Sequence, residues 1–285
     1  MQEAATQRVL SWGLAQLRDL PWRQTRDPWA ILVSEVMLQQ TQVERVIPRW
    51  FEFLDEFPTF QRCATAGLGD VLRMWQGLGY PRRARNLHAA ATAITEVGEF
   101  PHTLQGLLAL PGVGPYTARA LLAFAFEKDA AVVDTNIARV YARLAGRRLT
   151  SREVQAMADD ALPGEQSWAW NQCIMDLGAV LCRPAAPRCD ECPLRDDCAY
   201  HGVGDDPAVG SANVSVAQSR FEGSDRQGRG RLMKALGVTP VRVEELATTM
   251  RWPGQPERAS RVAATLVVDG LATFDDATAT FHLPR

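Results

Sequence analysis

Apolar residues recur every three or four positions along most of the first 200 residues, which is the period of an amphipathic helix. Pro and Gly separate the periodic segments, as at Leu162-Pro163-Gly164. Patterns of alternating apolar and polar residues are almost absent there, so we predict an all-α domain over residues 1–200. The predicted helices cover residues 29–45, 68–77, 84–97, 116–126, 135–146, 152–162 and 168–180.

The pattern changes after residue 200. Residues 201–220 are small and polar without periodicity, which predicts a linker. Three short helices are predicted over 230–236, 243–250 and 257–269, followed by a β-hairpin near the C-terminus. Helices followed by a hairpin are typical of a winged-helix module, which we assign to 221–285. A small helical cap without a nucleic-acid role is the alternative.

The composition describes a globular protein. The chain has 285 residues, 46% hydrophobic and 22% charged, enough for one large or two modest domains. The N-terminal residues lack the features of a secretory signal, and no run approaches the ~18 apolar residues of a membrane span. We therefore predict a cytoplasmic protein without membrane contact, acting as a monomer.

Net charge does not indicate a nucleic-acid partner. The formal charge is -2 and the pI is about 6.1, whereas nucleic-acid readers usually carry a basic face. Local clusters of arginine are interpreted as solvated helix faces. They are Arg82, Arg83 and Arg85, and Arg139, Arg143, Arg147 and Arg148.

Residues 108–143 predict a backbone clamp for DNA. A turn of Pro111, Gly112, Val113 and Gly114 precedes a predicted helix, whose first N–H groups and positive dipole end form a phosphate site. A Gly-x-Gly turn is also a common connection between two helices. Asp134 opens the next predicted helix, either as its N-cap or as a functional carboxylate beside the clamp, and the two roles are compatible.

Four cysteines predict a metal centre. Cys182, Cys189, Cys192 and Cys198 are spaced C-x6-C-x2-C-x5-C. Four thiols so close together in a reducing compartment suit thiolate coordination, and both zinc and a [4Fe-4S] cluster accept four cysteines. The remaining two, Cys63 and Cys173, are interpreted as ordinary buried residues.

Glu35 lies among apolar residues of a predicted helix. If it faces inward, desolvation favours its neutral form and makes it a general acid near neutral pH. Glu35, Gln39 and Gln42 also have the i, i+4, i+7 spacing of a solvated stripe, and periodicity alone favours the stripe.

Several motifs carry a resemblance to a known family. LPGVGPYTARA followed by VVDTNIARV resembles the helix-hairpin-helix and catalytic aspartate of base-excision DNA glycosylases related to endonuclease III. SEVMLQQTQV and MWQGLGYPRRARNLHAA are similar to motifs of the MutY family, which removes adenine mispaired with 8-oxoguanine. The resemblance covers about residues 10–200. It implies a two-lobed glycosylase with a C-terminal iron-sulfur loop, which binds double-stranded DNA that contains a mismatch.

The resemblance also implies roles for individual residues, and it places Glu35 inward, as the acid that protonates adenine N7. Asp134 would stabilise or attack the sugar cation, assisted by Tyr116 and Asn136. The adenine pocket would be lined by Arg18, Leu20, Trp22 and Gln172. DNA would be contacted by Gln40 and Tyr80, which wedge into the duplex, and by Pro111 to Gly114, and the four cysteines would hold a [4Fe-4S] cluster.

This chemistry is coherent, because an adenine in a duplex must be flipped out before its glycosidic bond can be reached. Two carboxylates then divide the work of leaving-group protonation and cation stabilisation, as in glycoside hydrolysis. Bifunctional relatives carry a lysine near the hairpin glycines, where this chain has Tyr116, so a monofunctional enzyme is predicted.

The chain departs from the family pattern in three places. Thr135 follows the aspartate where many relatives have glycine, and Tyr80-Pro81 replaces a double tyrosine. Residues 221–285 are too few for the usual Nudix-like domain and resemble the short tail of actinobacterial members, with Arg226 and Arg229 available to reach DNA. A thymine or uracil mismatch glycosylase, an endonuclease III-like glycosylase and a catalytically silent DNA-binding protein are the alternatives.

Overall fold

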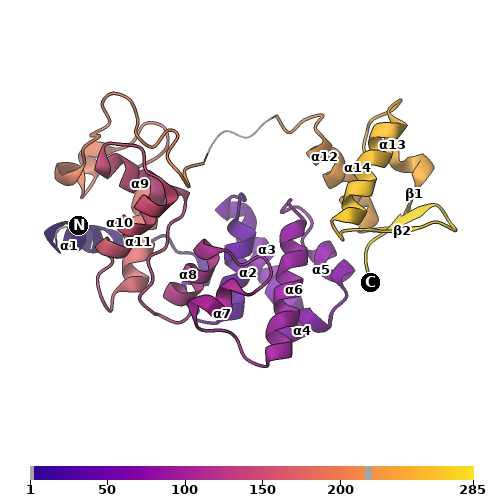
Figure 1. Cartoon of the computed structure of the whole chain (residues 1–285), viewed down its shortest axis with the longest axis horizontal. Helices are drawn as coiled ribbons and strands as arrows, with labels where there is room; N and C mark the ends of the chain where they lie inside the picture. Colours follow the sequence, from indigo (N-terminus) through magenta and orange to yellow (C-terminus); the bar gives the residue numbers. More distant parts are fainter. Residues whose placement is uncertain (1–2, 216–219) are drawn as a thin grey trace. The chain divides into compact units, whose positions relative to one another are not determined.

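The computed structural model describes residues 3–215 and 220–285, and helices dominate it (Figure 1). The main helices are α1 (Glu3–Leu14), α2 (Pro28–Leu38), α3 (Val43–Glu56), α4 (Phe60–Thr65), α5 (Leu68–Met74), α6 (Arg82–Val97), α7 (Leu104–Leu108), α8 (Pro115–Phe124), α9 (Thr135–Ala145), α10 (Ser151–Ala161), α11 (Ser167–Val180), α12 (Asp225–Leu236), α13 (Leu246–Thr249) and α14 (Pro256–Val268). Among the described residues, no helix is long and apolar enough to span a membrane.

The described chain forms two compact units. Of the described residues, the first unit contains 3–31, 102–108 and 113–215, and the second contains 32–101, 109–112 and 220–285. Residues 32–101, which belong to the predicted helical domain, thus lie in the second unit together with the C-terminal segment. The predicted all-α class is confirmed, and the exception is a short C-terminal sheet.

The first unit is built on α11. Helices α1 and α9 both pack on α11, and α10 packs on α9. Their apolar faces form one core that includes Ile137, Tyr141 and Trp170. Gly13 allows α1 to approach closely, since a Cβ there would lie 2.4 Å from the sulfur of Cys173. Both Cys63 and Cys173 are fully buried, which confirms their interpretation as core residues.

In the second unit, α4 and α5 pack against α6. Phe53 at the end of α3 lies beside Phe57 and meets Trp75 edge to face. The predicted helix over 29–45 is wrong in its second part, because α2 ends at Leu38 and α3 begins at Val43. Gln40, between them, has a φ of 58°, which no helix accommodates.

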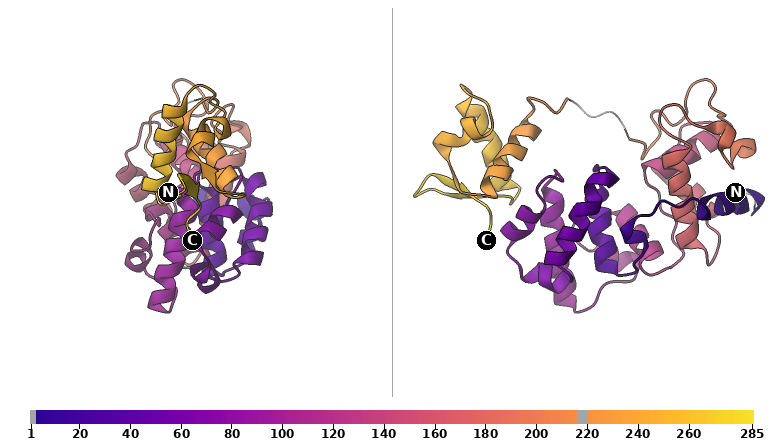
Figure 2. Two further views of the ribbon diagram at one scale, coloured as in Figure 1. Left: turned by 90° about the vertical axis from the view of Figure 1, so that its right-hand side faces the viewer. Right: turned by 180° about the vertical axis from the view of Figure 1, so that it is seen from behind.

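The C-terminal segment has the predicted helices and hairpin. Strands β1 (Val241–Arg242), β2 (Thr273–Asp275) and β3 (Thr280–His282) form an antiparallel sheet in the order β1-β3-β2. Figure 2 shows α12, α13 and α14 grouped beside this sheet. Phe274 and Phe281 face each other across it with ring centroids 4.7 Å apart.

This segment packs against the other helices of the second unit. A Cβ at Gly69 would lie 2.4 Å from the carbonyl oxygen of Pro284, and Gln76 donates to the carbonyl of Met233. Asp269, which caps the C-terminus of α14, accepts from Arg82 and Arg229. A carboxylate at a helix C-terminus opposes the helix dipole, so the two guanidinium groups offset this cost.

The predicted linker differs from the structure in its first part. Asp206 forms a bidentate ion pair with Arg143, and Ala208 and Ser211 are buried in the first unit. The backbone N–H of Ala212 donates to the carbonyl of Leu149. The segment consists mainly of small and polar residues without apolar periodicity, so its sequence does not indicate that it is folded. The predicted linker residues 216–219 lie outside the described residues.

We expect Asp269→Asn to loosen the C-terminal segment. The ion pairs hold the pKa of Asp269 below its usual value, so its contribution is present at neutral pH and lost as pH falls through that pKa. Loss of charge-assisted hydrogen bonds should lower the free energy of unfolding by about 1–3 kcal/mol. Urea unfolding at pH 7 measures this change.

The control is Asp225→Asn, which removes a carboxylate that pairs with Arg258 and Arg261 inside the C-terminal segment. Hydrogen exchange should quicken in α6 with Asp269→Asn and stay unchanged there with Asp225→Asn. Equal exchange in α6 for both variants would contradict the docking role of Asp269.

Candidate active site

The helix-hairpin-helix turn connects α7 and α8. Gly112 has a φ of 76°, and a Cβ there would lie 2.6 Å from the Cβ of Asn86, so both conformation and space require glycine. Gly114 is extended with a φ of -92° and caps α8, whose first residue is Pro115. Val113 is buried, whereas Pro111, Gly112 and Gly114 are exposed. The hairpin thus presents exposed backbone just before α8. Tyr116 lies half-buried in the first helical turn of α8.

Asp134 is the N-cap of α9, as predicted. Its Oδ1 accepts from the backbone N–H of Ile137 at 2.7 Å, and its Oδ2 accepts from the side-chain amide of Asn136 at 2.8 Å. Burial raises the pKa of Asp134, while these two donors and the charge of Arg139 act to lower it. The carboxylate is therefore held in one orientation in a partly desolvated position.

A chain of hydrogen bonds leads from Asp134 to the cysteine loop. The amide oxygen of Asn136 accepts from Arg139 at 2.8 Å. Arg139 also donates to the carbonyls of Cys182 at 2.7 Å and Gly178 at 2.6 Å. A Cβ at Gly178 would lie 2.7 Å from that of Asn136, so glycine allows α11 to approach α9 here. The position of Asn136, and through it of Asp134, depends on this contact with the loop.

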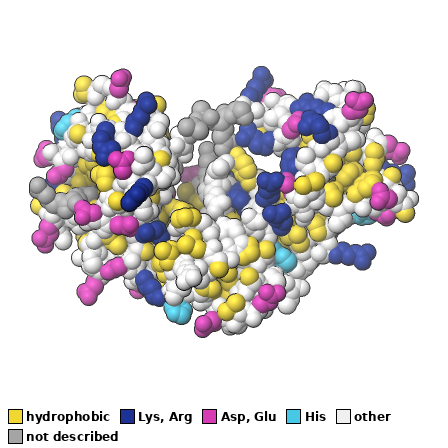
Figure 3. Space-filling view, viewed as in Figure 1, with side chains coloured by type: hydrophobic (Ala, Val, Ile, Leu, Met, Phe, Trp, Pro, Cys, Tyr) yellow, Lys and Arg dark blue, Asp and Glu magenta, His cyan; other side chains and the backbone are white. Residues whose placement is uncertain are grey.

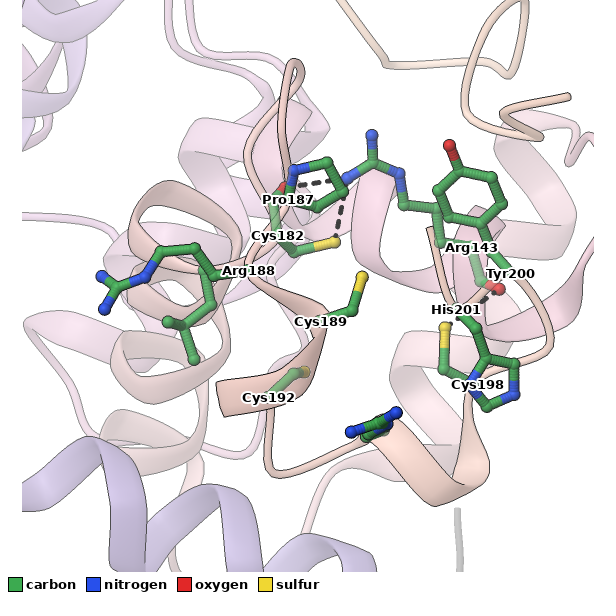
Figure 4. A pocket seen from close by; sticks show the side chains of 11 residues that line it. Arg143, Cys182, Pro187, Arg188, Cys189, Cys192, Cys198, Tyr200 and His201 are labelled. Atoms are coloured by element: carbon green, nitrogen blue, oxygen red, sulfur yellow. Dashed lines mark hydrogen bonds between the residues drawn. The ribbon is translucent and has the colours of Figure 1, made fainter. Parts of the chain in front are cut away.

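The four predicted metal ligands line one small pocket of the first unit (Figure 4). All four are free thiols, and Cys182, Cys189 and Cys198 lie around the same space. Arg143 donates to the sulfur of Cys182 at 3.3 Å and to the carbonyl of Arg183 at 2.8 Å. Within residues 3–215 and 220–285, no group of three or more His, Cys, Asp or Glu side chains has the arrangement of a single-ion site.

Glu35 lies in the second half of α2 and is 4% exposed. The stripe favoured by periodicity is wrong, because α2 ends at Leu38 and Gln42 lies outside this helix. Gln42 is exposed and Gln39 is half-buried. The structure therefore agrees with the inward position that the family resemblance implies for Glu35.

The predicted adenine-pocket residues belong to the first unit. Leu20 and Trp22 are buried beside Arg18 in the turn before α2, and Gln172 is buried in α11. Asp176, one helical turn after Gln172, ties the two segments together. It accepts from Arg18 at 2.7 Å.

Asp176 also binds the buried Arg23. Both guanidinium N–H groups of Arg23 donate to its two carboxylate oxygens at 2.8 Å. Burial acts to raise the pKa of Asp176, but the hydrogen bonds from Arg23 and Arg18 hold it below its usual value. The carboxylate thus remains charged and fixes the turn that carries Arg18, Leu20 and Trp22.

Gln40 and Tyr80, the predicted wedge residues, lie in two turns of the second unit. Both have left-handed backbone conformations, with φ of 58° and 47°, which are unfavourable for residues other than glycine. Both are exposed. Arg83 lies buried between the two turns and donates to carbonyl groups of each.

The interpretation of the arginine clusters as solvated faces is wrong for Arg83, Arg139 and Arg143, which are all buried. Each donates to backbone carbonyls of non-helical segments.

On the face drawn in Figure 3, Lys and Arg are interspersed with Asp and Glu, as the net charge suggests. Arg229 pairs with Asp269, and Arg226 lies over the ring of Phe221. Contact of these two arginines with DNA stays a prediction.

Sequence reasoning missed Asp176, Arg23 and Asp206. An aspartate within the apolar sequence of α11 was a signal for a buried partner, because a charge is buried only when it is paired. The identity of that partner was hidden, since Arg23 lies 153 positions away.

Comparison with known proteins places this geometry in a family. A family model described as "HhH-GPD superfamily base excision DNA repair protein" matches residues 33–162. The chain is 38% identical over 270 residues to an adenine DNA glycosylase of Mycolicibacterium smegmatis, covering 92% of this chain and 90% of that protein. The chain belongs to the adenine DNA glycosylase family.

Other relatives define which parts are shared. The human adenine DNA glycosylase is 40% identical over 211 residues, which cover 67% of this chain and 38% of the human protein. The alignment with the Mycolicibacterium smegmatis protein covers 92% of this chain, so it includes at least part of the C-terminal segment.

Solved structures agree on the fold. A thermostable thymine-DNA glycosylase is 29% identical with a TM-score of 0.65 and matches 69% of this chain and 94% of its own. Endonuclease III in a trapped covalent complex with DNA matches 70% of this chain with a TM-score of 0.62. Endonuclease III is 24% identical to this chain, and the similarity supports the fold only.

Proposed function

We propose that this protein is a monofunctional glycosylase that releases adenine paired with 8-oxoguanine or guanine in double-stranded DNA, acting as a cytoplasmic monomer. Family membership over 92% of the chain carries the proposal. The exposed turn at Pro111 to Gly114 binds the DNA backbone through its N–H groups and the start of α8. Gln40 and Tyr80 enter the duplex when the adenine is flipped out.

The flipped adenine is held by the turn of Arg18, Leu20 and Trp22 together with Gln172. Glu35 donates its proton to adenine N7, so that the base leaves neutral when the glycosidic bond breaks. The sugar is left as an oxocarbenium-like cation, which the Asp134 carboxylate stabilises. Tyr116 and Asn136 assist Asp134. Water adds to C1′ and loses a proton, which replaces the proton that Glu35 gave to adenine.

The reaction ends at an abasic site, because Tyr116 has no amine to form a Schiff base with the sugar. A second candidate is a thymine or uracil mismatch glycosylase, which the structural similarity to thymine-DNA glycosylase favours. The buried Glu35 supports the adenine reading, since an acid is needed to protonate a purine that leaves poorly as an anion.

The cysteine pocket is proposed to hold a [4Fe-4S] cluster. Cys182, Cys189, Cys192 and Cys198 would supply the thiolates, and the pocket they share supports this donor set. When bound, the cluster gives the loop its structure. The hydrogen bonds of Arg139 then join this loop to Asn136, beside Asp134.

Glu35→Gln tests the acid. The variant keeps the size of the side chain but has no acidic proton, so the single-turnover rate of adenine release should fall about 10²- to 10⁴-fold. DNA affinity, measured separately, should remain. Glu44→Gln, an exposed position of α3, is the control and should keep the wild-type rate. A wild-type rate for Glu35→Gln would remove Glu35 from the mechanism.

Asn136→Ala tests the environment of Asp134. Asp134 must be ionised to stabilise the cation, so the rate falls as pH falls through its raised pKa. Loss of the Asn136 donor disfavours the ionised form, and the acid limb of the pH-rate profile should move upward by up to about one pH unit. Thr135→Ala is the control, because Thr135 binds Ser215 and not the carboxylate. An unmoved limb would contradict the pairing.

Cys198→Ser tests the metal centre. Protein purified without oxygen should be brown, with iron and sulfide bound, and the variant should lose the colour and the stability that accompanies it. Cys63→Ser is the control, because this buried cysteine is remote in sequence and lies in the other unit. A colourless protein with bound zinc would overturn the cluster assignment.

A further inference from the structure

Two turns of the second unit carry the proposed wedge residues, and neither turn is held by regular secondary structure. The first runs from the end of α2 through Gln40 to Thr41. The second, before α6, contains Gly77, Gly79 and Tyr80, which all have positive φ. A left-handed conformation is unfavourable for a residue other than glycine and persists only when its surroundings hold it. Something must therefore hold both turns.

Arg83 makes the contacts that do so. One guanidinium nitrogen, Nη1, donates to the carbonyls of Val36 and Met37 at 2.9 Å and of Gln39 at 2.5 Å. The carbonyls of Val36, Met37 and Gln39 lie at and just after the end of α2, where helical partners are missing.

The other nitrogen, Nη2, reaches the second turn. It donates to the carbonyls of Leu78 at 2.9 Å and Gly79 at 3.0 Å, and to the hydroxyl of Thr41 at 3.1 Å. The Thr41 hydroxyl in turn donates to the carbonyl of Leu78 at 3.3 Å. One planar group thus joins the residue before Gln40 to the residue before Tyr80.

The environment of Arg83 excludes a direct role in DNA attraction. Its side chain lies against the rings of Trp75 and Tyr80 and is 8% exposed as a whole residue. Burial lowers its pKa to about 10, which still leaves it charged at neutral pH. The carbonyl oxygens and aromatic rings around the guanidinium group fix its orientation. Its positive charge interacts with these acceptors within the protein.

We propose that Arg83 is a positioning residue for base extrusion, which sets the spacing and orientation of Gln40 and Tyr80 before DNA arrives. The inference rests on the proposed wedge role of these two residues. A preorganised pair enters the duplex without ordering two flexible turns at the moment of flipping. Loss of Arg83 should slow extrusion and leave the chemistry of an already extruded adenine intact.

The test compares two substrates in single-turnover assays. One carries adenine opposite 8-oxoguanine in a duplex, and the other carries adenine in an unpaired bubble, where little extrusion is needed. Arg83→Gln should lower the rate on the duplex about 10- to 100-fold, since extrusion costs a few kcal/mol. On the bubble the loss should be under about threefold. Equal losses on both substrates would overturn the proposal.

Two further variants separate positioning from charge and from general folding. Arg83→Lys keeps the charge but lacks the planar fork that reaches both turns, so it should not restore the duplex rate. Arg231→Gln is the matched control, because Arg231 donates to the backbone carbonyl of Met250, which belongs to neither wedge turn. It should keep the wild-type ratio of duplex to bubble rates. Rescue by lysine, or a shifted ratio in the control, would contradict the proposal.

A spectroscopic signal reports extrusion without catalysis. With 2-aminopurine at the target position, wild-type binding should raise fluorescence as the base unstacks, and Arg83→Gln should reduce this rise at equal occupancy. Gln40→Ala and Tyr80→Ala test the wedge assignment itself. If these two variants extrude normally, the proposed wedge role fails, whereas normal extrusion by Arg83→Gln alone overturns only the positioning role.

Discussion

Buried arginines that donate to backbone carbonyls hold together the irregular parts of this protein. Helix ends leave carbonyl groups without partners, and a guanidinium group has five donors in one plane to satisfy them. Arg83 does this for two turns of the second unit, while Arg139 and Arg143 do it for the loop that begins at Cys182. Burying a charge without partners costs free energy, so each of these arginines stays buried only while its acceptors remain in place.

The candidate site depends on these contacts because its residues lie where helices begin or end. Asp134 caps α9, Tyr116 lies in the first turn of α8, and Gln40 and Tyr80 follow or precede helices. Exposed backbone and polar side chains are available at such places, but they have little packing of their own. The arginine and aspartate contacts supply the rigidity that binding and catalysis require.

Helical periodicity predicted most of the long helices. It failed where the backbone departs from regular geometry, as at Gln40, because a left-handed residue leaves the apolar spacing around it unchanged. It also misplaced Glu35, whose inward position came from the family resemblance, and it treated buried arginines as solvated. Pairs such as Arg23 with Asp176 join residues far apart in the sequence, and local patterns carry no information about them.

The most direct test of the account is base release from four duplexes in one assay: adenine opposite 8-oxoguanine, adenine opposite guanine, thymine opposite guanine and uracil opposite guanine, each with and without alkali. A monofunctional adenine glycosylase should release adenine from the first two, with strand breaks appearing mainly after alkali because Tyr116 replaces a lysine. Release of thymine or uracil with adenine untouched would contradict the account.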